Sequence, residues 1–368
     1  MISVIGGSGF VGTRLMKRLT HKGPEGVCET GAQRGQRDPL LICHDQPQAQ
    51  SQVNFAEQAV AHRIDLQIVD KNPSQTFPSF VVQADVRSVD ELRNTIPEGS
   101  VIINLAAEHS DDVRPISLYD DVNVGGARNI CLVANEKKVK TIIFTSTVAV
   151  YGFAPVGTDE SGVIAPFNDY GRTKYEAERV FKAWQQEMPD ERTLVIIRPT
   201  VVFGEQNRGN VYNLLKQIAA KKFLMIGSGQ NRKSMAYVEN VAAFIEHALT
   251  FSPGIHVYNY IDKPDFSMNE LVKTVNSTLG RSDSVIFRLP YAFGYAVGKA
   301  FDLLAAISGK RLTVSSIRIK KFCADTVFET SVQMSGFVPP VKLTEGLECT
   351  VRHEFLQTDQ SKVVFYSE

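Results

Sequence analysis

Residues 1–12 read MISVIGGSGFVG, and this opening stretch decides the fold of the chain. An apolar run precedes the glycines, and apolar side chains recur at helical spacing from Thr13 onwards, so we expect a buried strand, a tight turn and a helix. Glycines at this spacing let the backbone approach a pyrophosphate, which then lies against the N–H groups of the helix N-terminus. The residues expected to contact a dinucleotide here are Gly6, Ser8, Gly9, Phe10, Val11 and Gly12.

Residues 21–62 break the spacing that such a loop predicts. An acidic residue normally follows the glycines by about 20 residues, at the end of the second strand. The stretch is instead rich in Gln, Gly and charge, so we interpret it as an insertion, with a short helix near residues 54–62. Within it, residues 39–45 (PLLICHD) are a competing candidate for the second strand, which would then end in Asp45.

Asp70 is the acidic residue that we prefer for the cofactor ribose. The run 64–70 (IDLQIVD) ends in it, and a further strand ending at Asp85 follows with no room for another crossover. A carboxylate suits the two ribose hydroxyls of NAD and repels the 2′-phosphate of NADP, although Lys71 beside it weakens this preference. NAD is therefore the expected cofactor. Further contacts to it are expected from Asp85, Val86, Leu105, Ala106, Ala107, Asn123 and Pro199.

Tyr170 and Lys174 stand at i and i+4 of an expected helix, so the ammonium can lie close to the phenol and favour the phenolate. Thr147 follows an apolar strand, and its hydroxyl can share a substrate oxygen with that phenolate. These three side chains, behind a dinucleotide loop, indicate hydride transfer at a carbon that bears oxygen. We expect all three to be catalytic, and Tyr170 and Lys174 to contact NAD as well.

The composition indicates a soluble enzyme of the cytoplasm. With 368 residues, of which 43% are hydrophobic, the chain can bury a substantial core and form two lobes. The 40 basic and 40 acidic residues balance, so no attraction to nucleic acid is expected. The five cysteines show no CxxC spacing and the seven histidines no HExxH cluster, so we expect reduced thiols and no metal. We see no signal peptide.

Strands and helices alternate up to about Pro199, which predicts an α/β fold with a Rossmann-type doubly wound parallel sheet. Residues 121–134 are expected to form a helix beneath the sheet, and residues 194–200 a sixth strand. We assign residues 1–200 to an NAD-binding domain. The remaining expected divisions are a return to that domain at 234–260, a smaller, mostly helical substrate lobe at 201–233 and 261–350, and a C-terminal tail at 351–368.

In these motifs the chain resembles the extended short-chain dehydrogenase/reductase superfamily, and within it the NAD-dependent epimerase/dehydratase branch that acts on sugars. The resemblance covers nearly the whole chain apart from residues 21–62. Longer runs narrow it, among them LAAEHSDDV (105–113), RPTVVFGEQNRGNVYNLLKQI (198–218) and VYNYIDKPD (257–265). Together they resemble the enzymes that epimerise C4 of N-acetylglucosamine on undecaprenyl diphosphate, which make the GalNAc-linked lipid that starts O-antigen repeats.

The resemblance implies a sugar 4-epimerase that works through a transient 4-keto sugar. In it, Lys174 and the nicotinamide would lower the pKa of Tyr170. A 4,6-dehydratase of this superfamily carries an Asp-Glu pair after the hydroxyl residue, whereas Val148 and Ala149 stand there in this chain. A UDP-sugar 4-epimerase (UDP-GlcNAc or UDP-Glc) and an NAD-dependent sugar dehydrogenase or reductase stay open, because they need the same three residues. A non-catalytic NAD-binding regulator and a homodimer stay open as well.

The residues that contact the substrate are expected to carry amides or positive charge. Lys233 stands where sugar-nucleotide relatives carry a diphosphate-binding arginine, and residues 207–210 lead into a helix beside the cleft. His109 is expected to be structural. The basic residues Lys310, Arg311, Arg318, Lys320 and Lys321 suit a diphosphate, an anionic membrane or plain solvent. The expected substrate contacts are Thr147, Asn207, Arg208, Asn210 and Lys233.

Residues 289–307 form an apolar segment that carries charges only at Lys299 and Asp302. The segment is too interrupted to span a bilayer. An interfacial helix would place the enzyme peripherally on the inner face of the plasma membrane, where a prenyl-linked sugar is found. Core packing of the smaller lobe and a subunit interface are the alternatives.

Overall fold

The computed structural model describes residues 1–20, 65–110, 113–281, 287–308, 315–357 and 363–366. The insertion expected at 21–62 lies outside these residues, together with its candidate strand at 39–45 and its candidate helix near 54–62. Of the basic residues named above, Lys310 and Arg311 lie outside them as well. Everything below refers to the described part of the chain.

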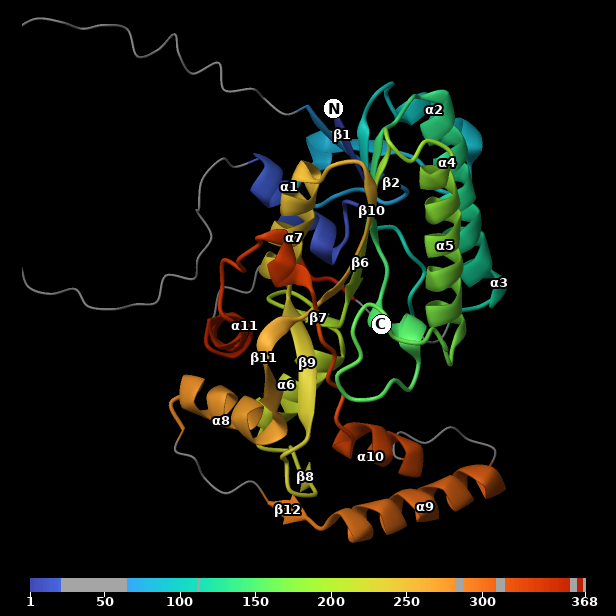
Figure 1. Ribbon diagram of the computed structural model, residues 1–368. Helices are drawn as coiled ribbons and strands as arrows, with labels where there is room; N and C mark the ends of the chain where they lie inside the picture. Colours follow the sequence, from blue (N-terminus) through green and yellow to red (C-terminus); the bar gives the residue numbers. More distant parts are fainter. Residues whose placement is uncertain (21–64, 111–112, 282–286, 309–314, 358–362, 367–368) are drawn as a thin grey trace, which may run out of the picture.

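A seven-stranded parallel sheet forms the centre of the protein, in the order β10-β6-β5-β4-β1-β2-β3 (Figure 1). The expected doubly wound fold is therefore confirmed. Strand β1 pairs with β2 on one side and with β4 on the other, so the chain leaves the centre of the sheet in both directions. The strands are β1 Ile2–Ile5, β2 Leu66–Asp70, β3 Val81–Gln83, β4 Val101–Asn104, β5 Thr141–Thr145, β6 Thr193–Pro199 and β10 Gly254–Tyr260.

Helices cover both faces of this sheet because its central strands are apolar on both sides. On one face α1 (Phe10–Thr20) packs against α7 (Val238–His247), and their buried side chains join those of the sheet in one core. The other face carries α2 (Val89–Thr95), α4 (Gly126–Glu136) and α5 (Asp169–Gln186), as Figure 1 shows. There Phe144, Phe181 and Trp184 are among the buried side chains of a second core.

The rest of the chain lies beyond the carboxyl ends of the main strands. A three-stranded sheet joins β7 (Val201–Phe203), β9 (Arg232–Tyr237) and β11 (Asp262–Ser267), and β8 (Met225–Ile226) pairs with β12 (Arg288–Leu289). The smaller lobe, expected to be mostly helical, thus combines helices with these short strands. Helices α6 (Asn210–Ala219), α8 (Met268–Thr278) and α11 (Leu343–Phe355) share a third apolar core with these strands.

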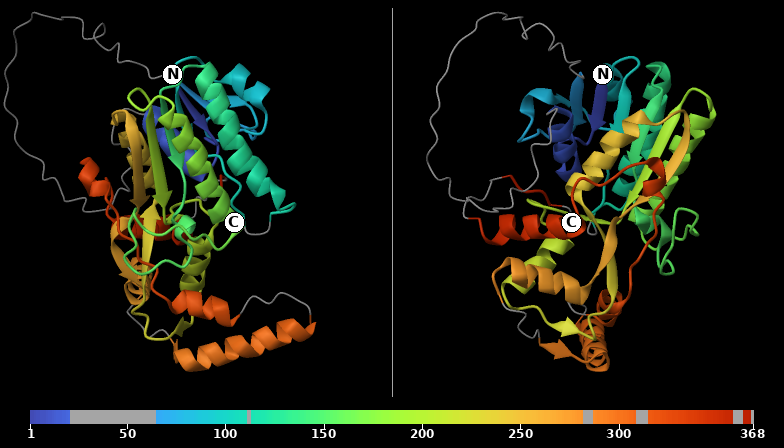
Figure 2. Two further views of the ribbon diagram at one scale, coloured as in Figure 1. Left: turned by 45° about the vertical axis from the view of Figure 1, so that its right-hand side comes forward. Right: turned by 60° about the vertical axis from the view of Figure 1, so that its left-hand side comes forward.

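Helices α9 (Tyr291–Ser308) and α10 (Ser316–Cys323) form a hairpin at the end of the molecule farthest from the first strand (Figure 2). Small residues let α9 approach its neighbours closely. A Cβ at Gly298 would lie 2.8 Å from the backbone of Ser316, and one at Gly294 would lie 2.8 Å from Ile226. The opposite side of α9 is exposed.

Element boundaries differ from the expected ones at several places. The sixth strand is where we predicted it, whereas the seventh, β10, was not recognised. The strand expected to end at Asp85 stops at Gln83, and β4 stops at Asn104, just before the cavity-lining residues 105–107. The helix expected at 121–134 begins as a π-helical segment, Asp120–Gly125, before α4.

Candidate active site

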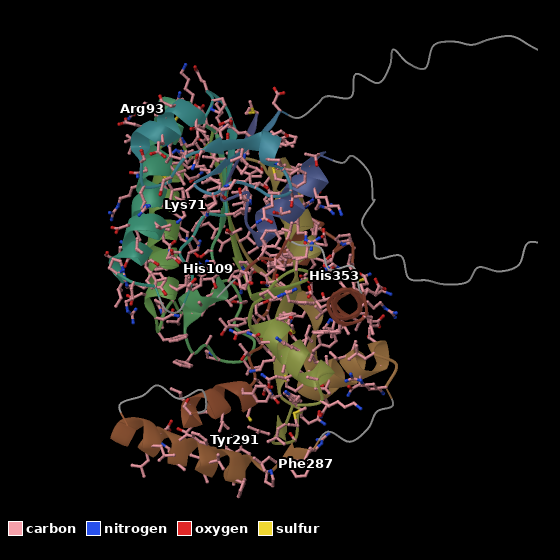
Figure 3. All side chains as sticks on the ribbon, turned by 180° about the vertical axis from the view of Figure 1, so that it is seen from behind. Lys71, Arg93, His109, Phe287, Tyr291 and His353 are labelled. Atoms are coloured by element: carbon pink, nitrogen blue, oxygen red, sulfur yellow. The ribbon has the colours of Figure 1, made fainter. Side chains whose placement is uncertain are left out.

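A cavity of about 830 Å³ opens where the carboxyl ends of the parallel strands face the smaller sheet. The glycine loop and the ends of β2, β4, β5 and β6 contribute to its wall, and so do residues 326 and 328 from the segment after α10. This edge of a doubly wound sheet is where ligands bind. Lys71 and His109, both labelled in Figure 3, line the cavity. His109 was expected to be merely structural.

The glycine loop leaves no room for side chains at two of its positions. Gly6 has a φ of +76°, and a Cβ there would lie 2.6 Å from the backbone nitrogen of Ala106. A Cβ at Gly12 would lie 2.6 Å from the Cα of Gly7. At Gly9 a Cβ would meet only the carbonyl oxygen of Gly6, at 3.5 Å. The loop is therefore pressed against the end of β4 and the start of α1, which is the cradle that a dinucleotide pyrophosphate requires.

Asp70 lies at the end of β2, directly beside this loop. Its carboxylate accepts hydrogen bonds from the backbone N–H of Ser8 at 3.1 Å and from that of Asn72 at 2.9 Å. The strand that ends in Asp70 is thus the neighbour of β1, as we predicted, and its acid lies where a ribose beside the pyrophosphate would reach it.

Asp85 also lines the cavity, but its charge is paired within the protein. Arg87 donates to it, with Nη2 at 2.6 Å from Oδ2, and this hydrogen bond holds the pKa of the Asp85 carboxyl below its ordinary value. The site as a whole fits a dinucleotide: a loop of glycines without side chains in the way, the Asp70 carboxylate for the ribose, and the small residues Ala106 and Ala107.

Thr147 and Tyr170 meet at the nicotinamide end of this cavity. Thr147 caps the 3-10 helix Val148–Tyr151 by accepting a hydrogen bond from the N–H of Ala149 at 3.1 Å. Tyr170 stands in the first turn of α5, whose cap is Asn168. A side-chain hydrogen bond joins Thr147 to the Tyr170 phenol. The two hydroxyls thus lie together at the wall of one cavity, and their sharing of a substrate oxygen stays a prediction.

Burial sets the pKa values of Tyr170 and Lys174. It raises the pKa of Tyr170 to about 12, while the hydrogen bond to Thr147 acts in the opposite direction. It lowers the pKa of Lys174 to about 7, while the nearby Glu178 carboxylate acts to raise it. We expected Lys174 to lower the pKa of Tyr170; in the structure Thr147 does so. The Lys174 ammonium lies over the ring of Phe144 instead, 4.3 Å from its centre.

Most of the residues predicted to hold NAD line the cavity, and Asn123 does not. Its buried side chain is used within the protein: the amide donates to the Glu108 carbonyl at 3.0 Å and to the Thr173 hydroxyl at 3.0 Å, and accepts from the Glu108 N–H. Asn123 therefore fixes the segment after β4, and its contact with NAD stays a prediction. The predicted cofactor residues that line the cavity are Gly6, Ser8, Gly9, Phe10, Val11, Gly12, Asp70, Asp85, Val86, Leu105, Ala106, Ala107, Tyr170, Lys174 and Pro199.

The expected substrate residues divide into two groups. Thr147, Asn207 and Asn210 line the cavity. Arg208 instead pairs with Glu354 at 2.8 Å and lies over the ring of Tyr212, on the side of α11.

Lys233 donates to the carbonyl of Ala324 at 2.7 Å and to the hydroxyl of Thr326 at 3.1 Å. Of the three, only Thr326 lines the cavity, so Lys233 supports its wall from behind.

The C-terminal segment supplies a part of the site that sequence reasoning missed. Phe365 pairs with the loop before α6, donating to the Gln206 carbonyl at 2.8 Å, and its ring packs 5.9 Å from that of Phe10 in the glycine loop. Tyr366 follows it and lines the cavity. A short aromatic tail has no periodicity that would signal such a contact, so only the three-dimensional arrangement reveals it.

Comparison with known proteins agrees with this geometry. Residues 2–260 match the family model of the NAD dependent epimerase/dehydratase family. The chain is 43% identical to the N-acetyl-alpha-D-glucosaminyl-diphospho-ditrans,octacis-undecaprenol 4-epimerase of Escherichia coli O157:H7, over 100% of this chain and 99% of that protein. It is 27% identical to the UDP-glucose 4-epimerase of Vibrio cholerae, over 97% and 96% of the two chains. A UDP-glucuronic acid 4-epimerase from Bacillus cereus, solved with NAD, shares the fold at a TM-score of 0.63 and 17% identity, over 95% of this chain and 97% of that one.

We predict that Asp70→Ala weakens NAD binding by at least about tenfold, because hydrogen bonds to a charged group contribute about 1.5–3 kcal/mol. Asp65→Ala is the matched control, since Asp65 is an exposed aspartate at the opposite end of β2. Isothermal titration of cofactor-free protein with NAD measures both. Should Asp45→Ala be the damaging change and Asp70→Ala be harmless, the placement of the ribose at β2 is wrong.

Proposed function

Because this chain belongs to the NAD-dependent epimerase/dehydratase family, we propose that it inverts C4 of N-acetylglucosamine carried on undecaprenyl diphosphate, giving the N-acetylgalactosamine epimer. The single observation that carries this proposal is the full-length similarity to the Escherichia coli enzyme that bears this activity in its name. The intact side chains at the cavity support an active enzyme over a cofactor-binding regulator. The epimerised lipid would then supply O-antigen or other surface polysaccharide assembly.

Each side chain at the cavity has a defined task in such a reaction. Tyr170, as phenolate, takes the proton of the sugar 4-hydroxyl and later returns it, while Thr147 hydrogen-bonds the same oxygen throughout. Thr147 also acts to lower the pKa of Tyr170, and Lys174, as ammonium, adds a positive charge to the same cavity wall. Bound NAD supplies the hydride acceptor and donor for C4. Between the two transfers the sugar is a 4-ketone, and its rotation in the cavity exposes the other face of C4, so that the returning hydride adds to that face and C4 is inverted.

The residues around Thr147 argue against elimination of water. Val148 and Ala149 follow Thr147 in the 3-10 helix, and neither side chain can protonate a leaving hydroxyl. A dehydratase is therefore not supported. We propose Asn207 and Asn210 as substrate contacts, because both line the cavity. Their amides can bind sugar hydroxyls or phosphate oxygens.

We predict that Tyr170→Phe lowers epimerase turnover by at least about a hundredfold, because a general acid–base group contributes roughly 10²–10⁴. The phenyl ring still fills the same space, so fold and NAD binding should be retained. Tyr175→Phe is the control, since Tyr175 lies on the same helix, packed against the cluster around Tyr151. Conversion of GlcNAc to GalNAc is measured by chromatography of the released sugars. Near-normal conversion by Tyr170→Phe would contradict the mechanism.

The carrier of the sugar is the open part of this proposal, because a UDP-sugar 4-epimerase needs the same site. We expect radiolabelled GlcNAc-diphosphate-undecaprenol to be converted at least about tenfold faster than UDP-GlcNAc at equal concentration, since only the lipid-linked sugar would meet every contact of a site adapted to it. Equal conversion of both, or conversion of UDP-GlcNAc alone, would replace the lipid by the nucleotide carrier.

The hairpin of α9 and α10 is where we propose that the protein meets the membrane. Within the described ranges no helix is long and apolar enough to cross a bilayer. The outer side of α9 nevertheless exposes Phe293 (59%), Leu303 (63%) and Leu304 (54%). Lys299 and Lys320 are exposed on the same hairpin, which adds attraction to anionic lipids. Figure 3 shows Tyr291 and Phe287 at the start of this hairpin, and both are exposed.

We predict that Phe293→Glu combined with Leu304→Glu releases the protein from anionic vesicles. Inserting two apolar side chains of this size into lipid contributes about 3–6 kcal/mol together, and the charged side chains lose this contribution. Met334→Glu with Val338→Glu is the control, since these two apolar residues are even more exposed (83% and 80%) but lie beside α7. Vesicle flotation measures binding, and circular dichroism confirms that each variant is folded. Full retention of vesicle binding by the α9 variant would rule out this surface.

A further inference from the structure

Glu178 is a buried carboxylate that the mechanism above does not use. It lies one helical turn after Lys174 on α5 and is fully buried. Arg198 of β6, itself 3% exposed, binds it through two hydrogen bonds, with Nη2 at 2.6 Å from Oε2 and Nε at 2.8 Å from Oε1. The Ser146 hydroxyl donates to Oε1 at 2.6 Å.

These bonds tie together the elements that carry the catalytic residues. Ser146 directly precedes Thr147 at the end of β5, and Glu178 shares α5 with Lys174. Arg198 also donates to the hydroxyl of Tyr151 at 2.6 Å, and Tyr151 belongs to the 3-10 helix that Thr147 caps. One buried ion pair thus contacts every segment that positions the catalytic groups.

A need for stability does not account for such a pair. Removing two charges from water costs several kcal/mol for each ion, and well-packed apolar residues of similar volume often stabilise a fold equally well or better. Glu178 is moreover the nearest carboxylate to act on the buried Lys174, whose cationic form burial disfavours. A negative charge at this place favours the ammonium form of Lys174 at the cavity wall.

We propose that Glu178, fixed by Arg198, is a positioning residue for catalysis: its charge holds Lys174 in the ammonium form, and its bond to Ser146 holds Thr147 in place. This inference rests on the epimerase function proposed above. It goes beyond that function because it assigns a role to a pair that touches neither the cofactor nor the substrate.

The charged groups around this pair give the effect a definite sign. Glu178 is faced by Arg198 from β6, by Lys182 from its own helix at 3.9 Å, and by Tyr151 from the 3-10 helix, with Glu160 beyond Tyr151. Tyr170 and Lys174 line the same cavity. The Glu178 carboxylate raises the pKa of Lys174 against the effect of burial, so its removal lowers that pKa further and confines the ammonium to more acidic pH.

The test is the Glu178→Gln variant, which keeps the shape and removes the charge. Turnover should fall at alkaline pH, because the alkaline limb of the pH profile should shift to lower pH by about one unit. At a pH above the Lys174 pKa of both variant and wild type, that shift is a tenfold loss of turnover. Glu178→Asp, which keeps the charge, should restore the limb. Glu176→Gln is the matched control, because Glu176 pairs with Arg172 on the same helix but away from Lys174, so its profile should equal that of the wild type.

A second readout does not depend on the reaction. Competitive acetylation of the cofactor-free protein at a series of pH values, followed by peptide mass spectrometry, reports the pKa of Lys174 directly. It should be lower in Glu178→Gln than in Glu176→Gln and the wild type. A wild type inactive on the lipid-linked sugar would overturn the proposed function alone, while the labelling would still decide the role of Glu178.

The double variant Glu178→Gln with Arg198→Met controls for misfolding, because it leaves no unpaired charge at the position of the ion pair. Because the Glu178 charge is missing here too, the lower pKa of Lys174 and the shifted alkaline limb should persist. Reduced thermal stability with an unchanged pH profile and an unchanged Lys174 pKa, in either variant, would show a purely structural pair and overturn the proposal.

Discussion

The pairing of β1 with β2 and β4 at once is the constraint on which the site depends. The register aligns Ile5 with Val69 on one side and with Asn104 on the other. Parallel strands in register end at the same edge of a sheet, so three segments that follow them are forced together: the glycine loop, Asp70 and residues 105–107. The Gly6 N–H donates to Val69, and the Leu105 N–H to Ile5, at the last rungs of this ladder. The shape of the cavity therefore depends on the register of β1 with β2 and β4.

Electrostatics then divides the site into two halves. Around the glycines, backbone N–H groups and a solvated acid suit a charged dinucleotide. Around Tyr170 and Lys174 the protein is dry, and burial disfavours the charged form of each side chain. Two neighbours act against these effects: Thr147 acts to lower the pKa of Tyr170, and Glu178 acts to raise that of Lys174. The site is thereby prepared for a proton to leave a sugar hydroxyl at near-neutral pH.

Sequence reasoning reached the sheet and the catalytic trio because these rest on local patterns. A glycine loop between an apolar strand and a helix, or Tyr and Lys one helical turn apart, can be recognised from neighbours in the chain. The partners of Arg208 and Lys233 could not be predicted, because a basic residue near a cleft has several competing partners; Glu354 and the Ala324 carbonyl bind them here. The role of Asn123 was missed for the same reason. Strand β10 and Tyr366 went unrecognised, since their contacts join residues far apart in sequence.

The position of residues 363–366 has a practical consequence for handling the protein. Phe365 is clamped between the glycine loop and the loop before α6, so the chain emerges at the mouth of the cavity. An affinity tag or fluorescent fusion at this end of the chain would follow closely on Tyr366, a residue of the cavity wall. Met1 is exposed and precedes the central strand β1, at the amino ends of the parallel strands (Figure 2). Fusions at that end leave the entrance clear.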